Sequence, residues 1–276
     1  GRNSFYKASD TYPISIYAKD FDNNGSYDAF PTLYIPTSHM DEVKKEYPAQ
    51  TRDDIVKQMI GMRSKFQNYK TFAIATKDEL LSKEQLAVAQ VVKANNLSSS
   101  YIQNKGAGKF EITSLPIQAQ FSVLNGMQVD DYDGDGNLDI LMNGNDYGTE
   151  VSVGRYDALN GLLLKGNGKG LFTALSILES GIFIPGNGKA LVKIRGAKGQ
   201  YLMAASQNRG PLKVYALKKK TNILTVAPTD ASAIIEYANG KKRKEEFYYG
   251  NSFLSQSGRF ISYNEKVKLI TIIDQK

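Results

Sequence analysis

The chain has 276 residues, of which 41% are apolar, and a formal net charge of +7; it is long enough for one large domain or two smaller ones. The absence of cysteine excludes disulfides, thiol catalysis and cysteine-based zinc sites, while the single histidine, His39, has no partner for acid–base chemistry and is expected in a surface loop. No segment reaches the roughly eighteen consecutive apolar residues of a membrane span, so no transmembrane segment is predicted in this chain.

An acidic loop at residues 20–28 is the first element with a specific pattern. Apolar residues alternate over residues 14–18 before it and 33–35 after it. This alternation is typical of strands, so the loop is predicted to close a β-hairpin. Oxygen-bearing side chains occupy its odd positions, with glycine at position six; in order these are Asp20, Asp22, Asn24, Gly25, Ser26 and Asp28.

The pattern changes to a helical one between about residues 40 and 97. Thr51 can cap a helix whose apolar stripe runs with helical spacing from Ile55 to Phe66. Ser82 and Gln85 form a capping box before a second apolar run. These signals predict a helical insertion inside a β architecture.

A second acidic loop lies between two glycine-rich segments. Residues 101–110 and 162–172 each combine an apolar strand, a glycine-rich turn and an aromatic residue, a recurrence typical of β-propellers and similar arrays. Apolar residues flank the loop at 123–129 and 140–142, which predicts a second hairpin. The loop repeats the first pattern with Asp131, Asp133, Asp135, Gly136, Asn137 and Asp139.

The C-terminal part returns to strand patterns after a lysine-rich boundary at 217–221. The predicted strands are 234–237, 246–249, 260–263 and 269–273. The basic run 241–244 follows Asn239-Gly240, which is a strong hairpin turn signal. Because the other basic residues are dispersed, solvated turn charge is favoured over nucleic-acid binding.

Both acidic loops carry the donors that calcium prefers. Calcium takes six to eight oxygen ligands, and alternate residues of a tight loop can turn their oxygens inward. Clustered carboxylates repel one another unless a cation neutralises them. We therefore predict two calcium sites, in which Ser26 and Asn137 at position seven offer backbone carbonyls; a metal-free polar turn remains the alternative.

The surroundings of the loops argue against an EF-hand. That motif needs helices on both sides and a bidentate glutamate at position twelve, where this chain has Pro31 and Met142. The second loop offers four carboxylates and the first offers three. By ligand charge, the second loop is expected to bind calcium more tightly.

These loops, together with residues 104–110, resemble the FG-GAP/VCBS repeats of integrin-like β-propellers, in which such a loop joins the first two strands of a blade. Segments 235–241 and 250–257 resemble the ASPIC/UnbV domain that follows such repeats. The resemblance implies a mainly β fold with propeller-like blades over residues 1–220, forming a partial propeller that carries the helical insertion, and a small β domain over residues 221–276. It also implies an extracellular, periplasmic or outer-surface protein and a longer polypeptide.

The function expected from these features is a non-enzymatic calcium-binding module whose stiffened hairpins support a protein- or glycan-binding face. The alternative is a propeller-type polysaccharide lyase or hydrolase, or its carbohydrate-binding domain. A cleft for that chemistry would be lined by acidic and tyrosine side chains, namely Asp130, Asp146, Glu150, Tyr156 and Asp157. The sequence shows no nucleophile–base pair and no phosphate-binding loop, and catalysis is therefore not expected.

Overall fold

The computed structural model describes residues 2–38, 43–151, 153–219 and 221–274. Strands hold 42% of the chain and helices 13%, which confirms the mainly β fold. Contacts within the chain define two compact units, residues 2–97 and residues 98–276. His39, expected in a surface loop, lies outside the described residues.

The unit of residues 2–97 is built on one four-stranded antiparallel sheet with the order β3-β2-β1-β4. Its strands are β1 (Ile14–Lys19), β2 (Asp28–Pro36), β3 (Lys44–Pro48) and β4 (Gln90–Ala94). Tyr17 pairs with Phe30 across β1 and β2, and both side chains are buried. The first acidic loop joins these two strands, as the alternation predicted.

Five short helices follow the third strand: α1 (Arg52–Gln58), α2 (Met62–Lys65), α3 (Tyr69–Ala73), α4 (Lys77–Leu80) and α5 (Lys83–Ala87). The predicted caps are present, since Thr51 accepts from the Asp54 amide and Ser82 forms the box with Gln85. The predicted single helix is interrupted, because α1 ends at Gln58 and Gly61, a poor helix former, precedes α2.

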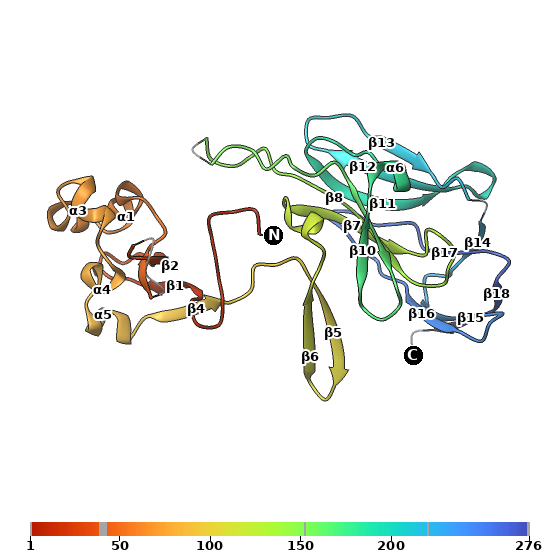
Figure 1. The fold of residues 1–276 in the computed structure, drawn as a ribbon, viewed down its shortest axis with the longest axis horizontal. Helices are drawn as coiled ribbons and strands as arrows, with labels where there is room; N and C mark the ends of the chain where they lie inside the picture. The colour runs from red at the N-terminus through yellow and green to blue at the C-terminus, as the bar shows by residue number, and fades with distance from the viewer. Residues whose placement is uncertain (1, 39–42, 152, 220, 275–276) are drawn as a thin grey trace. The chain divides into compact units, whose positions relative to one another are not determined.

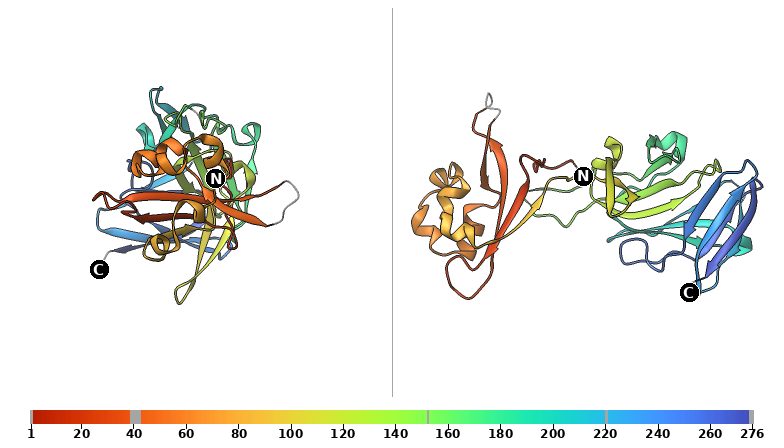
Figure 2. Two further views of the ribbon diagram at one scale, coloured as in Figure 1. Left: turned by 90° about the vertical axis from the view of Figure 1, so that its left-hand side faces the viewer. Right: turned by 90° about the horizontal axis from the view of Figure 1, so that it is seen from below.

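These helices form a layer on one side of the sheet, as Figure 2 shows. Their apolar stripe stays buried despite the interruption: Ile55 and Met59 are 0% and 1% exposed, and they belong to one core with Tyr17 and Phe30. Burying such side chains stabilises by roughly 1.5–3 kcal/mol each. The helical region is thus the second layer of this unit.

A buried ion pair joins the helical layer to the sheet. The Glu46 carboxylate on β3 accepts from Lys77 Nζ at 2.8 Å, Thr32 Oγ1 at 2.6 Å and Tyr17 Oη at 3.2 Å. Burial opposes the charge on Glu46, but these donors outweigh it and lower its pKa. Burial likewise opposes the charge on Lys77, and the Glu46 carboxylate overcomes it and raises the Lys77 pKa.

The unit of residues 98–276 begins with a two-stranded hairpin and a four-stranded antiparallel meander (Figure 1). The strands are β5 (Ser100–Gly106), β6 (Lys109–Ser114), β7 (Leu124–Asp130), β8 (Asp139–Gly144), β9 (Leu162–Gly166) and β10 (Phe172–Leu175). A 3-10 turn, Ile117–Gln120, precedes β7. Both glycine-rich segments form hairpins, and the second acidic loop joins β7 to β8.

Three further antiparallel sheets complete this unit, with the orders β11-β12-β13, β14-β17 and β16-β15-β18. Their strands are β11 (Gly188–Arg195), β12 (Tyr201–Gln207), β13 (Lys213–Ala216), β14 (Asn222–Thr225), β15 (Asp230–Tyr237), β16 (Lys242–Glu246), β17 (Phe260–Tyr263) and β18 (Val267–Asp274). A helical turn, α6 (Ile177–Ser180), follows β10. The strand expected at 246–249 ends at Glu246.

The boundary expected near residue 220 falls inside this second unit. Tyr201 on β12 packs edge-on against Phe260 on β17, with ring centroids 5.5 Å apart. Ile223 packs against the same core. Segments on both sides of residue 220 therefore share one core, whereas the compact units separate at residues 97 and 98.

Candidate metal centres

The first acidic loop is closed by its own carboxylates. Asp20 at position one accepts from the Gly25 amide at 2.9 Å, and Asp28 at position nine accepts from the Phe21 amide at 2.9 Å. Gly25 has φ of +87°, a left-handed conformation that glycine adopts without strain. Glycine at position six thus allows the turn that brings the first and ninth residues together.

The second loop repeats this arrangement in a different sheet. Asp131 accepts from the Gly136 amide at 2.9 Å, and Asp139 accepts from the Tyr132 amide at 3.0 Å. Gly136 has φ of +85°. The two loops therefore share backbone geometry and hydrogen-bond pattern, although they lie in different units of the chain.

Three carboxylates converge in each loop. One oxygen from each of three aspartates lies within 4.8 Å of the other two, and the groups are Asp20, Asp22 and Asp28, and Asp131, Asp133 and Asp139. One buried oxygen in each loop, Oδ1 of Asp22 and Oδ1 of Asp131, has no hydrogen-bond partner. An unpaired buried carboxylate oxygen is costly, and a bound cation would supply its missing partner.

The other predicted ligands lie in the loops but outside these convergent groups. The Asn24 side chain accepts from the Ser26 amide at 2.8 Å, and the Asp135 side chain accepts from the Asn137 amide at 2.7 Å. Asp135 also lies 3.5 Å from Lys165. The side chains at position five thus hold the turn in shape.

Crowding of the carboxylates changes their acidity. Burial, with the charges of Asp133 and Asp131, raises the Asp139 pKa to about 6. Burial and the charges of Asp22 and Asp20 raise the Asp28 pKa as well. Both loops therefore hold carboxylates whose negative charge is unfavourable until a cation is near.

The first loop forms hydrogen bonds with the neutral Gln58. Gln58 at the end of α1 donates its side chain to no loop carboxylate; instead its carbonyl oxygens accept from Asn24 Nδ2 at 3.4 Å and the Ala29 amide at 2.9 Å. Among the ion pairs of the described residues, none involves Asp20, Asp22 or Asp28. In the described part of the chain, no basic side chain pairs with the carboxylates of this loop, although Arg52, Lys57 and Arg63 line the same hollow as Asp22.

Cationic side chains surround the second loop. Lys165 on β9 forms an ion pair with Asp133, and Arg243 on β16 lies 3.6 Å from Asp131. Three more lysines donate to loop oxygens: Lys219 to the Asp133 carbonyl, Lys241 to the Asn137 side chain and Lys266 to the Gly134 carbonyl. The second loop thus has protein counter-ions that the first loop lacks.

Arg243 belongs to a buried charge network beneath the second loop. It bonds Glu245 at 3.2 Å, and Glu245 lies 3.4 Å from Lys193. Lys193 is also 3.5 Å from Asp130, whose carboxylate accepts from Tyr201 Oη at 3.0 Å. The network connects the loop to β11, β12 and β16 of the same unit.

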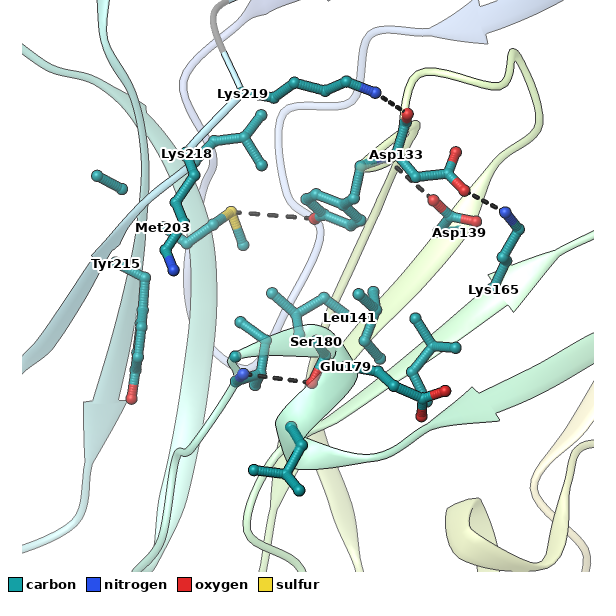
Figure 3. Close-up of a pocket in the computed structure, with 18 residues that line it drawn as sticks. Asp133, Asp139, Leu141, Lys165, Glu179, Ser180, Met203, Tyr215, Lys218 and Lys219 are labelled. Atoms are coloured by element: carbon teal, nitrogen blue, oxygen red, sulfur yellow. Dashed lines mark hydrogen bonds and ion pairs between the residues drawn. The ribbon is translucent and has the colours of Figure 1, made fainter.

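A cleft of about 420 Å³ opens beside the second loop (Figure 3). Asp133 and Lys165 lie on one side of it, and Lys218 and Tyr215 lie on the other. Tyr132 also lines the cleft, and its hydroxyl lies 4.0 Å from the Met203 sulfur. Apolar side chains line the remainder, including Leu141, Leu163, Leu175, Ile182 and Leu217.

The residues considered for a catalytic cleft are either engaged with other groups or exposed. Asp130 is 2% exposed and engaged in the charge network. Asp146 and Tyr156 pair through their backbones, while the side chain of Asp146 accepts from the Gly148 amide at 3.0 Å. Glu150 and Asp157 are exposed. Asp130 is thereby assigned a structural role beneath the loop.

The basic residues around the second loop were not anticipated as part of a site. The run 241–244 was interpreted as solvated turn charge, which holds for Lys242 and Lys244, but Arg243 is only 9% exposed. Alternation along β16 places Arg243 on the inner face of the strand, and this alternation is the sequence signal that could have identified Arg243 as part of the site. Lys165 had no comparable signal, because its partner Asp133 is remote in sequence.

Comparison with protein-family models and curated proteins identifies no relative of this chain. The likeness to FG-GAP/VCBS repeats and to ASPIC/UnbV domains therefore stays a prediction. Among the described residues, no helix combines the length and apolar character needed to cross a bilayer.

Proposed function

We propose that this chain is a non-enzymatic calcium-binding module in which the cation stiffens two hairpin loops. The observation that carries the proposal is the repeated geometry: in each loop three carboxylates converge within 4.8 Å, and one buried oxygen has no partner. A chance cluster of acidic side chains has no reason to repeat the same amide-to-carboxylate bonds in two different sheets.

The side chains of the second loop test more strictly whether these sites suit a bound cation. The Asp131 side chain is only 8% exposed, yet its Oδ1 atom has no hydrogen-bond partner. All donors in both groups are oxygens, which suit hard cations such as calcium better than zinc or copper. Bound calcium would supply the positive charge that offsets the repulsion between these carboxylates. Its ligands would be Asp20, Asp22 and Asp28 in the first loop and Asp131, Asp133 and Asp139 in the second.

We extend the proposal to the architecture and setting of the module. In both four-stranded sheets the acidic loop joins the first two strands, β1 to β2 and β7 to β8, which is the place that the FG-GAP/VCBS resemblance assigns to it. This supports the proposal that the sheets are propeller-like blades of an extracellular, periplasmic or outer-surface protein. Its partner would be a protein or a glycan.

Calcium titration of the whole chain tests the proposed function. Isothermal calorimetry should show two sites, and a chelator should lower the melting temperature. Terbium, a luminescent stand-in for calcium, should be sensitised by Tyr27 and Tyr132, which lie within the two loops. Replacing Asp20, Asp22 and Asp28 with asparagine should remove one site, and the same change at Asp131, Asp133 and Asp139 the other.

The asparagine variants keep side-chain size and remove charge, so they also serve as controls for folding. Loss of one site should leave the other intact, because the loops lie in separate compact units. Folded wild-type protein that takes up neither calcium nor terbium would overturn the proposal. Binding that survives both sets of substitutions would place the cation elsewhere.

A further inference from the structure

The cleft beside the second loop has a charge balance that depends on the loop. Three lysines line it, Lys165, Lys218 and Lys219, and three carboxylates, Asp133, Asp139 and Glu179, line it too. Their charges cancel. If a divalent cation binds at Asp133 and Asp139, the same cleft carries a surplus of two positive charges, so it should accept anions only in the loaded state.

The apolar part of the cleft lining indicates what kind of group the anion carries besides its charge. Seven of its lining side chains are leucine, isoleucine or methionine, with Leu141, Leu163 and Met203 among them. Two tyrosines, Tyr132 and Tyr215, also line the cleft, but the aliphatic side chains are more numerous and offer the contact that a hydrocarbon body needs. The volume of about 420 Å³ lies within the range of roughly 300–1,000 Å³ usual for small-molecule sites.

The position of Lys165 connects the charge of the cleft with the cation site of the second loop. Its ammonium group is paired with Asp133 at the edge of the cleft. A cation at Asp133 competes with this pair and leaves Asp135, 3.5 Å away, as the remaining carboxylate partner of Lys165. Lys218, in the segment after β13, lies on the opposite side of the cleft (Figure 3), so a bound carboxylate would have a lysine on each side.

We propose that this cleft binds a small aliphatic carboxylate, and that binding requires a cation in the second loop. The inference rests on the proposed calcium site and adds a ligand class to it. The carboxylate would face the cation and the lysines, and its hydrocarbon body would contact Leu141, Leu163 and Met203. The protein would thus use calcium to control access to a ligand site as well as to stiffen a loop.

Methyl NMR of the whole chain with hexanoate as the probe tests this proposal. With ¹³C-methyl methionine labelling, the Met203 signal reports on the cleft, and the Met59 signal, from the core of the other unit, is the internal control. We expect hexanoate to shift Met203 and not Met59 in calcium, and its affinity to fall at least about tenfold in chelator, because loss of two nearby charges removes the electrostatic attraction.

Two further probes separate head group from body. Hexanol has the hydrocarbon body without the charge, and we expect its weaker binding to be insensitive to calcium. Acetate has the charge without the body, and we expect no shift of Met203 at concentrations where hexanoate saturates. A short peptide acid ending in leucine presents the same chemistry, so its affinity relative to hexanoate distinguishes a chain terminus from a free acid as the source of the ligand.

Lys218→Met removes one cleft charge and keeps an aliphatic stem. It should weaken hexanoate binding by at least about threefold, the effect of losing one charged hydrogen bond at a partly exposed site, while calcium affinity stays unchanged. Lys268→Met, at an exposed lysine of β18, is the matched control and should change neither affinity.

The outcomes distinguish this inference from the function on which it rests. Calcium binding at the second loop without a hexanoate shift at Met203 overturns the inference and leaves the calcium module standing. Hexanoate binding of equal strength in calcium and in chelator also overturns it, since the coupling is then absent. Failure of calcium to bind at the second loop overturns the inference and removes the second of the two proposed calcium sites.

Discussion

The two acidic loops have the same backbone and different electrostatic surroundings. In each, a glycine amide at position six closes onto the first carboxylate, and three carboxylates converge. The first loop packs against the neutral Gln58, whereas Lys165 and Arg243 contact the second. Sequence pattern thus determines loop geometry, while the rest of the fold determines the energy of placing a cation there.

This difference changes the expected order of calcium affinity. Carboxylate count favours the second loop, because it has four aspartates to the first loop's three. Only three of those four converge, and two of them already have a basic partner. A cation entering the second loop must displace these partners, and we therefore expect the first loop to bind calcium more tightly.

The largest effect is expected for Arg243→Met. In chelator this variant should lose about 3–5 kcal/mol of unfolding free energy in the unit of residues 98–276, since Asp131 loses its basic partner and Glu245 keeps only Lys193. Calcium should reduce the loss by neutralising Asp131. Urea unfolding followed by the Met203 methyl signal measures both values.

Arg52→Met is the matched control for that experiment. Arg52 is a largely buried arginine near the first loop, but it donates to the Phe66 carbonyl at 2.6 Å and pairs with Asp53. Its loss should be detected at Met59 and should not depend on calcium. An Arg243→Met effect that is likewise independent of calcium would show that Arg243 does not act as counter-ion to the loop.

The next effect in size concerns pH in the unit of residues 2–97. The Glu46 pKa is lowered in the folded state, so its stabilising contribution is complete above its unfolded pKa and is lost as the pH falls through the folded pKa. Glu46→Gln should abolish this acid sensitivity and cost about 3 kcal/mol at neutral pH, because Lys77 loses its partner. Urea unfolding at Met59 between about pH 7 and pH 3 tests this.

Calcium should leave the Glu46 effect unchanged, since Glu46 binds Lys77, Thr32 and Tyr17 and belongs to neither loop. Glu79→Gln is a suitable control, because its exposed carboxylate caps α4 instead. If the acid sensitivity of wild-type protein survives in Glu46→Gln, another carboxyl group is responsible.

A smaller effect distinguishes the two expected orders of calcium affinity, one based on carboxylate count and the other on the basic neighbours of the second loop. A cation at about a hundredfold excess over its Kd stabilises the folded state by about 2.7 kcal/mol. We expect Asp22→Ala to lose more of this calcium-dependent stabilisation than Asp133→Ala, which is the reverse of the order predicted by carboxylate count. Calorimetric titration of both variants gives the two affinities. Tighter binding at the second loop would show that its basic neighbours do not compete with calcium.

The smallest effect is expected for Lys165→Met. Removing this exposed competitor should raise the calcium affinity of the second loop by up to about fivefold, the range of a solvent-exposed ion pair. Lys57→Met is the control, because Lys57 pairs with Asp54 and not with a carboxylate of the first loop. Unchanged affinity in Lys165→Met would leave Arg243 as the sole effective counter-ion.

Local pattern predicted the elements that carry the loops. Alternation of apolar residues predicted the β1–β2 and β7–β8 hairpins, because every second residue of a strand with one buried face is apolar. Capping predicted the starts of α1 and α5, because Thr51 and Ser82 act on amides two or three residues away. The aspartates that converge were all among the predicted ligands.

Contacts between distant segments could not be predicted in this way. Nothing near Asp131 indicates that Arg243 will lie beside it, and nothing near Tyr201 indicates that Phe260 will pack on its ring. The expected boundary near residue 220 followed composition, which reports on exposure and not on the partners of the flanking strands. The cleft was missed for the same reason, since its lining comes from β8, β9, β12 and β13 together.

The separation in sequence between the second loop and its basic partners also has a consequence during synthesis. The β7–β8 hairpin closes over a short loop, with Asp130 opposite Asp139, and short closures form early. Tyr237 reaches Asp131 from 106 residues further along the chain, and Arg243 emerges from the ribosome later still. For that interval the nascent hairpin lacks Tyr237 and Arg243, so Lys165, which follows soon after the loop in the sequence, and any dissolved cation are the counter-ions available to its carboxylates. The C-terminal sheet must later dock onto the loop with whichever of them is then in place.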